Sequence, residues 1–156
     1  MVNMVISFLI VIFSVAYASH HPNHFGDSCW LCECYVEYTD RDVALPSIPY
    51  KIVQDAYEAT EDRCLAACIN DEECKAVVYG LTGGRDVFTC ELYDQLNTRP
   101  PIYTPYVNTY IKRSSKCEKS TNHLLPLDLV DGDEKVLERK SKHLKLQHKL
   151  NPFHFG

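Results

Sequence analysis

Residues 60–93 read TEDRCLAACINDEECKAVVYGLTGGRDVFTCELY, and this stretch decides the fold. Thr60 is a favourable N-cap residue, and the two acidic residues after it suit the positive end of a helix dipole. A helix is therefore predicted from there to about Asn70, a residue common at helix ends. Cys64 and Cys68 are four residues apart on this helix, so both point to one face and can be tied to the same sheet.

Strands are predicted on both sides of this helix. The candidate segments are rich in β-branched and aromatic residues and are bounded by turn residues. They are residues 34–39, 50–53, 74–81, 87–93 and 106–112. Gly83 and Gly84 lie between the third and fourth segments and predict the turn of a hairpin.

The chain has 156 residues and eight cysteines, all between positions 29 and 117. An even set of cysteines indicates a disulfide framework in an oxidising compartment, and metal binding or catalysis in the cytosol. The compartment therefore determines whether the cysteines are interpreted as disulfides or as metal-binding or catalytic thiols.

The N-terminus predicts secretion. Residues 1–18 carry no charged side chain, and Ala16-Tyr17-Ala18 supplies a small-x-small cleavage pattern. This stretch is shorter than the roughly 20 apolar residues of a membrane span, and no second run of spanning length follows. We interpret it as a signal peptide, with an uncleaved anchor as the alternative, and we expect no stable membrane span.

Three zones follow the signal peptide. Residues 19–28 form a polar, His-rich arm, residues 29–117 hold every cysteine, and residues 118–156 form a cysteine-free tail. The stapled zone is small enough for crosslinks to matter to its stability. We expect the tail to be partly helical or disordered.

The cysteine spacing resembles that of the PAN/apple domain family. The matching features are C-x3-C-x5-C across Cys64, Cys68 and Cys74, then a strand, a turn and Cys90 followed by Glu-Leu-Tyr. The resemblance covers residues 34–117. It implies a small disulfide-rich α+β domain, with one helix packed on a curved antiparallel sheet of about five strands.

The resemblance also implies the disulfide pairing. It implies Cys64–Cys90 and Cys68–Cys74 bridges and a bridge that closes the ends of the domain, here Cys34–Cys117. Cys29 and Cys32 depart from the family pattern. We expect them to pair with each other, and Cys32–Cys117 with Cys29–Cys34 remains open.

Enzymatic activity is not expected. The C-x-x-C of Cys29 and Cys32 is flanked by acidic Asp27 and Glu33, whereas a reactive thiolate needs positive surroundings. A zinc site on the three thiolates of C-x2-C-x-C, at Cys29, Cys32 and Cys34, is disfavoured by the full disulfide set. The sequence holds no G-x-S-x-G, H-E-x-x-H or phosphate-loop motif, and no cofactor is expected.

One metal site is a candidate at the mature N-terminus. Cleavage after Ala18 leaves Ser19-His20-His21, and a free amine with His at the third position can hold Cu(II) or Ni(II) in a plane of nitrogen ligands. His20 can assist His21 or compete with it. Binding of this kind in a test tube does not by itself imply a physiological role.

The tail carries a basic segment. Residues 135–150 contain six Lys or Arg and one Glu, whereas residues 19–117 contain nine basic and fifteen acidic side chains. The candidate anion-binding residues are Lys135, Arg139, Lys140, Lys142, Lys145 and Lys149. They predict charge attraction to sulfated glycosaminoglycans or an acidic matrix, with a solvated tail as the alternative.

These observations favour a secreted, non-enzymatic binding module that recognises an extracellular protein or glycan. The alternative is a structural component of the extracellular matrix anchored by its basic tail, and a thiol oxidoreductase is a third candidate. The formal net charge of −5 disfavours a nucleic-acid partner.

Overall fold

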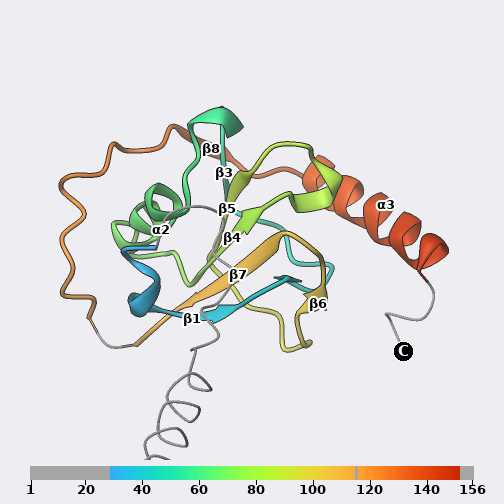
Figure 1. The fold of residues 1–156 in the computed structure, drawn as a ribbon, viewed down its shortest axis with the longest axis horizontal. Coiled ribbons are helices and arrows are strands. Elements are labelled where there is room, and N and C mark those ends of the chain that lie inside the picture. The colour runs from blue at the N-terminus through green and yellow to red at the C-terminus, as the bar shows by residue number, and fades with distance from the viewer. Residues whose placement is uncertain (1–28, 115, 152–156) are drawn as a thin grey trace, which may run out of the picture.

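The computed structural model describes residues 29–114 and 116–151 (Figure 1). They form an antiparallel six-stranded sheet in the order β1-β7-β4-β5-β3-β8, and a separate two-stranded ribbon, β2-β6. The strands are β1 (Tyr35–Tyr38), β2 (Arg41–Asp42), β3 (Lys51–Val53), β4 (Ala76–Gly80), β5 (Thr89–Tyr93), β6 (Ile102–Tyr103), β7 (Val107–Lys112) and β8 (Leu129–Asp131). The helices are α2 (Glu61–Ile69) and α3 (Glu134–Leu150), with short 3-10 turns η1 (Cys32–Cys34), η2 (Ala56–Glu58) and η3 (Thr82–Gly84).

The predicted α+β class is confirmed, with a sixth strand in the main sheet and a second helix in the tail, which was expected to be partly helical or disordered. The expected signal peptide at 1–18 and the His-rich arm at 19–28 lie outside the described residues.

Helix α2 begins where its capping residue predicts. The Thr60 side chain accepts a hydrogen bond from the backbone N–H of Arg63, and the helix ends at Asn70 as its C-cap. The Asp62 carboxylate accepts hydrogen bonds from the backbone N–H groups of Trp30 and Leu31, at 3.0 and 2.8 Å. The start of α2 therefore also fixes the segment that carries the first two cysteines.

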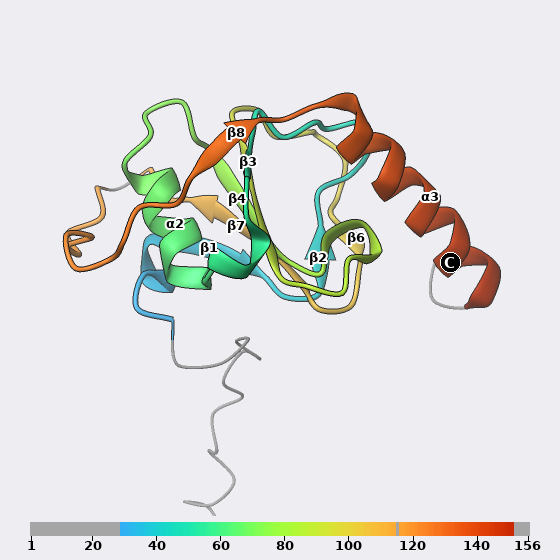
Figure 2. The ribbon, with the colours of Figure 1, turned by 90° about the horizontal axis from the view of Figure 1, so that it is seen from above.

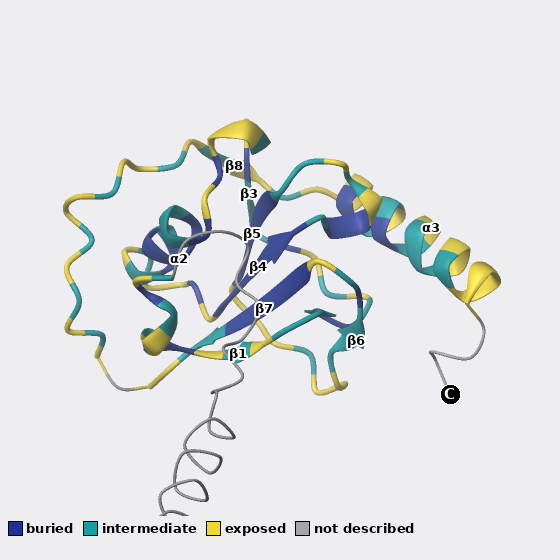
Figure 3. Ribbon diagram, in the orientation of Figure 1, coloured by how far each residue is buried: buried dark blue, intermediate teal, exposed yellow. Residues whose placement is uncertain are grey.

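Alternation along the central strands gives the sheet two buried faces. One face packs on α2, and it includes Val77 and Leu92. Their neighbours Val78 and Tyr93 belong to a second cluster on the opposite face. Figure 2 shows α2 on one side of the sheet, with the β2-β6 ribbon and α3 on the other side. Figure 3 shows β4, β5 and β7 buried, while α3 is mostly exposed or half-buried.

The structure contains four disulfides. They join Cys29 to Cys32, Cys34 to Cys117, Cys64 to Cys90, and Cys68 to Cys74. These are the expected pairs, including the one between Cys29 and Cys32. The last two bridges fasten α2 to the sheet, and all four of their cysteines are fully buried.

The expected domain boundary after Cys117 is wrong. Strand β8 pairs antiparallel with β3 and forms the edge of the main sheet, so the region after Cys117 belongs to the same fold. Gly132 follows β8 and donates its backbone N–H to the carbonyl of Tyr50 at 3.0 Å. A Cβ atom at Gly132 would collide with the backbone of Pro49, so glycine permits this close approach.

Helix α3 starts directly after this contact. The Asp133 side chain caps the helix by accepting from the backbone N–H groups of Lys135 and Val136, at 3.1 and 3.3 Å. Within the described ranges, no helix is both long and apolar enough to cross a bilayer.

Candidate functional site

Helix α3 has a narrow inner face and a wide basic outer face. Val136 and Lys140 are its buried residues, and they are four residues apart on one side of the helix. The basic residues of the outer face that are exposed to solvent are Lys135, Lys142, Lys145 and Lys149. The basic segment predicted from the sequence is therefore a docked helix that presents lysines to solvent.

Lys140 is not available to an external ligand, which corrects its assignment as an anion-binding residue. Only 2% of its side chain is exposed, and its Nζ lies 2.8 Å from an Asp42 carboxylate oxygen and 2.6 Å from one of Glu91. Nζ also donates to the Tyr93 hydroxyl at 2.8 Å. Three groups from β2 and β5 thus enclose the ammonium and fasten α3 to the body of the protein.

The buried cluster is ionised in a definite pattern. Burial works against the charge of Lys140, but Asp42 and Glu91 hold its pKa well above the usual value. Burial also works against the charge of Glu91, yet Lys140 keeps the pKa of this carboxyl below its usual value. Burial dominates at Asp42 and raises its pKa. Lys140 nevertheless lies within ion-pair distance of both carboxylates.

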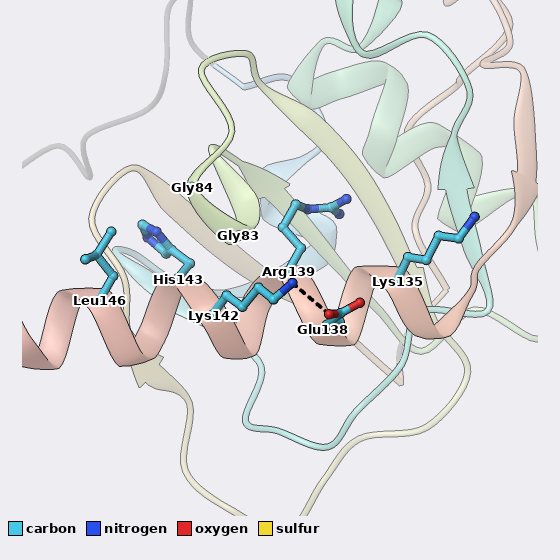
Figure 4. Close-up of a pocket in the computed structure, with 8 residues that line it drawn as sticks. All are labelled: Gly83, Gly84, Lys135, Glu138, Arg139, Lys142, His143 and Leu146. Atoms are coloured by element: carbon cyan, nitrogen blue, oxygen red, sulfur yellow. Dashed lines mark ion pairs between the residues drawn. The ribbon is translucent and has the colours of Figure 1, made fainter.

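Three of the remaining cations of α3, Lys135, Arg139 and Lys142, border a groove between this helix and the η3 turn (Figure 4). The groove has a volume of about 400 Å³. Its lining residues are Gly83, Gly84, Lys135, Glu138, Arg139, Lys142, His143 and Leu146. Among the candidate residues, the structure thus brings together Lys135, Arg139 and Lys142 at one site.

The acidic residue of the groove does not cancel this charge. Glu138 forms an ion pair with Lys142 at 2.7 Å, and both side chains are mostly exposed. Such pairs between neighbouring turns of a helix contribute about 0.3–0.5 kcal/mol, so an incoming anion can compete for Lys142. Lys135 and Arg139 add two further positive charges to the same groove.

Two glycines form the opposite wall of the groove. Gly83 and Gly84 have φ values of +60° and +72°, in the left-handed region. A Cβ atom at Gly84 would collide with the His143 ring, and one at Gly83 would lie 3.1 Å from Nε of Arg139. The sequence predicted only a hairpin turn here, and the pair of glycines is the signal that the backbone approaches another element.

His143 lies against this turn and is half-buried. Burial lowers its pKa, with a smaller opposing effect from Asp42. The imidazole therefore gains its positive charge at a lower pH than an unperturbed histidine does.

Lys145 and Lys149 lie outside the lining of the groove. Lys149 is seven residues beyond Lys142 and continues the same side of the helix, since seven residues are nearly two full turns. Lys135, Lys142 and Lys149 together form a row about 21 Å long, at about 1.5 Å per residue. We call this set the lysine row.

The candidate metal sites do not coincide with this groove. His20 and His21 lie outside the described residues. Cys29, Cys32 and Glu61 bring three ligand atoms within 4.8 Å of one another. The two sulfur atoms form a disulfide, however, and metal ligation requires thiolates.

The C-x-x-C segment is built as a structural element. Its Trp30 is half-exposed, and Nζ of Lys119 lies 4.6 Å from the centre of the indole ring. Lys119 also donates to the carbonyl of Trp30 at 2.7 Å and pairs with Glu33 at 2.9 Å. These contacts fasten the disulfide loop to the segment that follows Cys117.

Compared with known proteins, the chain matches no family model, no curated protein and no solved structure.

Proposed function

We propose that this protein is a secreted, non-enzymatic binding module that holds sulfated glycosaminoglycan along α3. The observation that carries the proposal is the lysine row, displayed on a helix that is anchored by a buried lysine. Because Lys140 makes the buried ion pairs of the helix, the exposed lysines of the outer face can reach a ligand. The resemblance to PAN/apple domains agrees with a binding role, and the four disulfides agree with an oxidising compartment.

The row favours an extended ligand over a small one. It is about 21 Å long at 1.5 Å per residue, so one small anion cannot reach all three lysines. A polyanion can contact them together, and the attraction adds along the chain. The acidic excess of residues 19–117 then keeps the rest of the protein from binding the same polymer.

Replacing Lys135 and Lys142 together with Gln is expected to weaken heparin binding roughly tenfold at low salt. Each lysine is expected to contribute about 0.7 kcal/mol to binding, and losing two such contacts reduces the affinity about tenfold. Gln retains good helix propensity, so α3 should persist. The measurement is elution from immobilised heparin in a salt gradient, together with a dissociation constant at low salt.

The matched control is the double variant K75Q/K116Q. It removes the same charge from two exposed lysines outside α3. We expect it to elute close to the wild type. If both double variants elute with the wild type, or if both are weakened alike, α3 is not the binding surface.

Lowering the pH from 7 to 5 is expected to strengthen heparin binding, with most of the gain below pH 6.5. The His143 imidazole carries a positive charge only when protonated, and burial places its pKa below the usual value. The charged groups that line the groove with it are Lys135, Glu138, Arg139 and Lys142 on α3, and Asp42 acts on it from β2. Heparin affinity measured across this range checks the prediction.

The control for this pH dependence is the other histidine of the helix. His148 is exposed in the last turn of α3. We expect H143Q to flatten the pH dependence and H148Q to leave most of it. An unchanged profile in H143Q would assign the effect to other groups.

A further inference from the structure

Arg139 holds a donor that the protein leaves without an acceptor. Its Nε is buried and has no hydrogen-bond partner among the described residues. Its Nη2 lies 3.9 Å from Glu91, beyond hydrogen-bond distance. Buried donors without partners are rare in folded proteins, and such a donor is commonly one that binds an ion or a ligand.

The acceptor nearest to Arg139 is already in use. The two carboxylate oxygens of Glu91 bind Thr82 Oγ1 at 2.9 Å and Lys140 Nζ at 2.6 Å. The Arg139 side chain is 31% exposed, so one part of it is buried and another faces the groove. The exposed part of the Arg139 side chain lines the groove, where a bound anion can supply an acceptor for the guanidinium in place of the occupied Glu91.

A second guanidinium lies close to the first. Arg85 follows the η3 turn, and its pKa is lowered by burial and by the charge of Arg139. Its side chain donates to Thr89 Oγ1 at 3.4 Å. The positive charge of Arg85 therefore acts on Arg139, although Arg85 does not itself line the groove.

We infer that the turn end of the groove is a seat for one tetrahedral oxyanion ester, bound by Arg139, Lys142 and His143 opposite Gly83 and Gly84. This inference rests on the proposed function and adds a specific contact to it. The lysine row attracts any polyanion, whereas the seat selects the chemical type of its charged groups. Figure 4 shows the Arg139 and His143 side chains extending from α3 toward the turn.

The arrangement of donors favours a tetrahedral group over a carboxylate. The charged and polar donors that line the groove come from successive turns of α3, and the backbone of the η3 turn faces them. An ester sulfate or phosphate offers three terminal oxygens that point in different directions, whereas a carboxylate offers two oxygens in one plane. The two glycines contribute no side chains, so the turn can lie directly against Arg139 and His143 without displacing them.

The experiment compares three dextrans with the same degree of substitution, carrying sulfate, phosphate or carboxymethyl groups. The polymer backbone is then constant, and the charged group is the variable. For the wild type we expect one of the ester forms to bind about tenfold more tightly than the carboxymethyl form at low salt. The ratio between sulfate and phosphate dextran identifies which ester fills the seat.

The informative variant is R139K, which keeps the positive charge and removes Nε and the planar fork. We expect it to lose about tenfold in affinity for the preferred ester and less than twofold for carboxymethyl dextran. K149Q is the control, because Lys149 belongs to the lysine row but does not line the groove, and it should weaken all three polymers by the same factor. Thermal unfolding of R139K verifies that the fold is retained.

Two outcomes overturn the seat without overturning the proposed function. In one, the wild type binds all three dextrans with equal affinity. In the other, R139K weakens all three alike. Failure of the wild type to bind any of the polymers would instead refute the proposed function itself.

Discussion

Replacing Lys140 with Met is expected to destabilise the protein by about 3–5 kcal/mol at neutral pH. Breaking a buried ion pair by removing one partner leaves an uncompensated charge, and this has a cost of that size. Here the removed ammonium lies within 3 Å of Asp42 and Glu91, whose side chains are 8% and 1% exposed. Met keeps most of the side-chain volume, so the loss reports on the charge. Chemical denaturation monitored by far-UV circular dichroism measures it.

Part of this loss is expected to appear as release of α3 from the sheet. Apart from Lys140, the helix has one buried residue, Val136. Undocking would expose the two carboxylates to water and limit the cost of their unpaired charge. Amide hydrogen exchange of residues 134–150 should therefore become faster in K140M, while exchange in β4, β5 and β7 changes less.

The loss of stability caused by K140M should become smaller as the pH falls toward 4. Without the ammonium, burial raises the pKa values of both carboxyls above those of the unfolded chain. A carboxyl group whose pKa is higher in the folded protein than in the unfolded chain stabilises the folded state below about pH 4, the pKa in the unfolded chain. This contribution is lost as the pH rises through the pKa of the folded protein. The difference between K140M and the wild type is then largest at neutral pH and smallest near pH 4.

K142M is the matched control for K140M. It carries the same substitution two residues along the same helix, at a lysine whose side chain is 74% exposed. Its effect on stability is expected to stay within about 0.5 kcal/mol. Equal stabilities of K140M and K142M would show that the buried ion pair does not anchor α3.

Local patterns were sufficient to predict the centre of the fold. Thr60, the acidic residues after it and Asn70 marked the ends of α2, and the structure places the helix between them. Segments rich in β-branched and aromatic residues between turn residues marked β1, β3, β4, β5 and β7, because such side chains pack well on the pleated surface of a sheet. Each of these signals lies within the element that it predicts or directly beside it.

The elements that were missed depend on distant partners. Strands β2, β6 and β8 contain only two or three residues, too few for a period to be recognised. β8 forms because it pairs with the edge of β3, which lies more than seventy residues away in the sequence. This is why the boundary after Cys117 was misplaced.

The same limit applies to the candidate site. Lys140 is one of six basic residues in its segment, and nothing in its neighbourhood sets it apart from Lys142. Its burial follows from carboxylates 98 and 49 positions earlier in the chain, at Asp42 and Glu91. The groove likewise combines a hairpin turn with a helix that were predicted as separate parts.

Removal of the Cys64–Cys90 bridge in C64A/C90A is expected to cost about 3–5 kcal/mol. In the chain-entropy model, a crosslink with a sequence separation of 26 residues contributes about 3.5 kcal/mol by restricting the unfolded chain. Both sulfur atoms are also fully buried between α2 and β5, so their loss leaves a small cavity. Replacing both cysteines avoids a free thiol. Denaturant unfolding at 25 °C measures the change.

The control is C29A/C32A, which removes the same chemical bond at a sequence separation of three residues. The same model assigns only about 1.6 kcal/mol to so short a loop, and these cysteines are only partly buried. The Asp62 carboxylate would still bind the backbone N–H groups of Trp30 and Leu31, which holds the loop on α2 without its bridge. A clear order is therefore expected, with C64A/C90A less stable than C29A/C32A. If the two variants lose the same stability, loop length and burial do not determine what these bridges contribute, and the Cys64–Cys90 bridge is not a principal connection between α2 and the sheet.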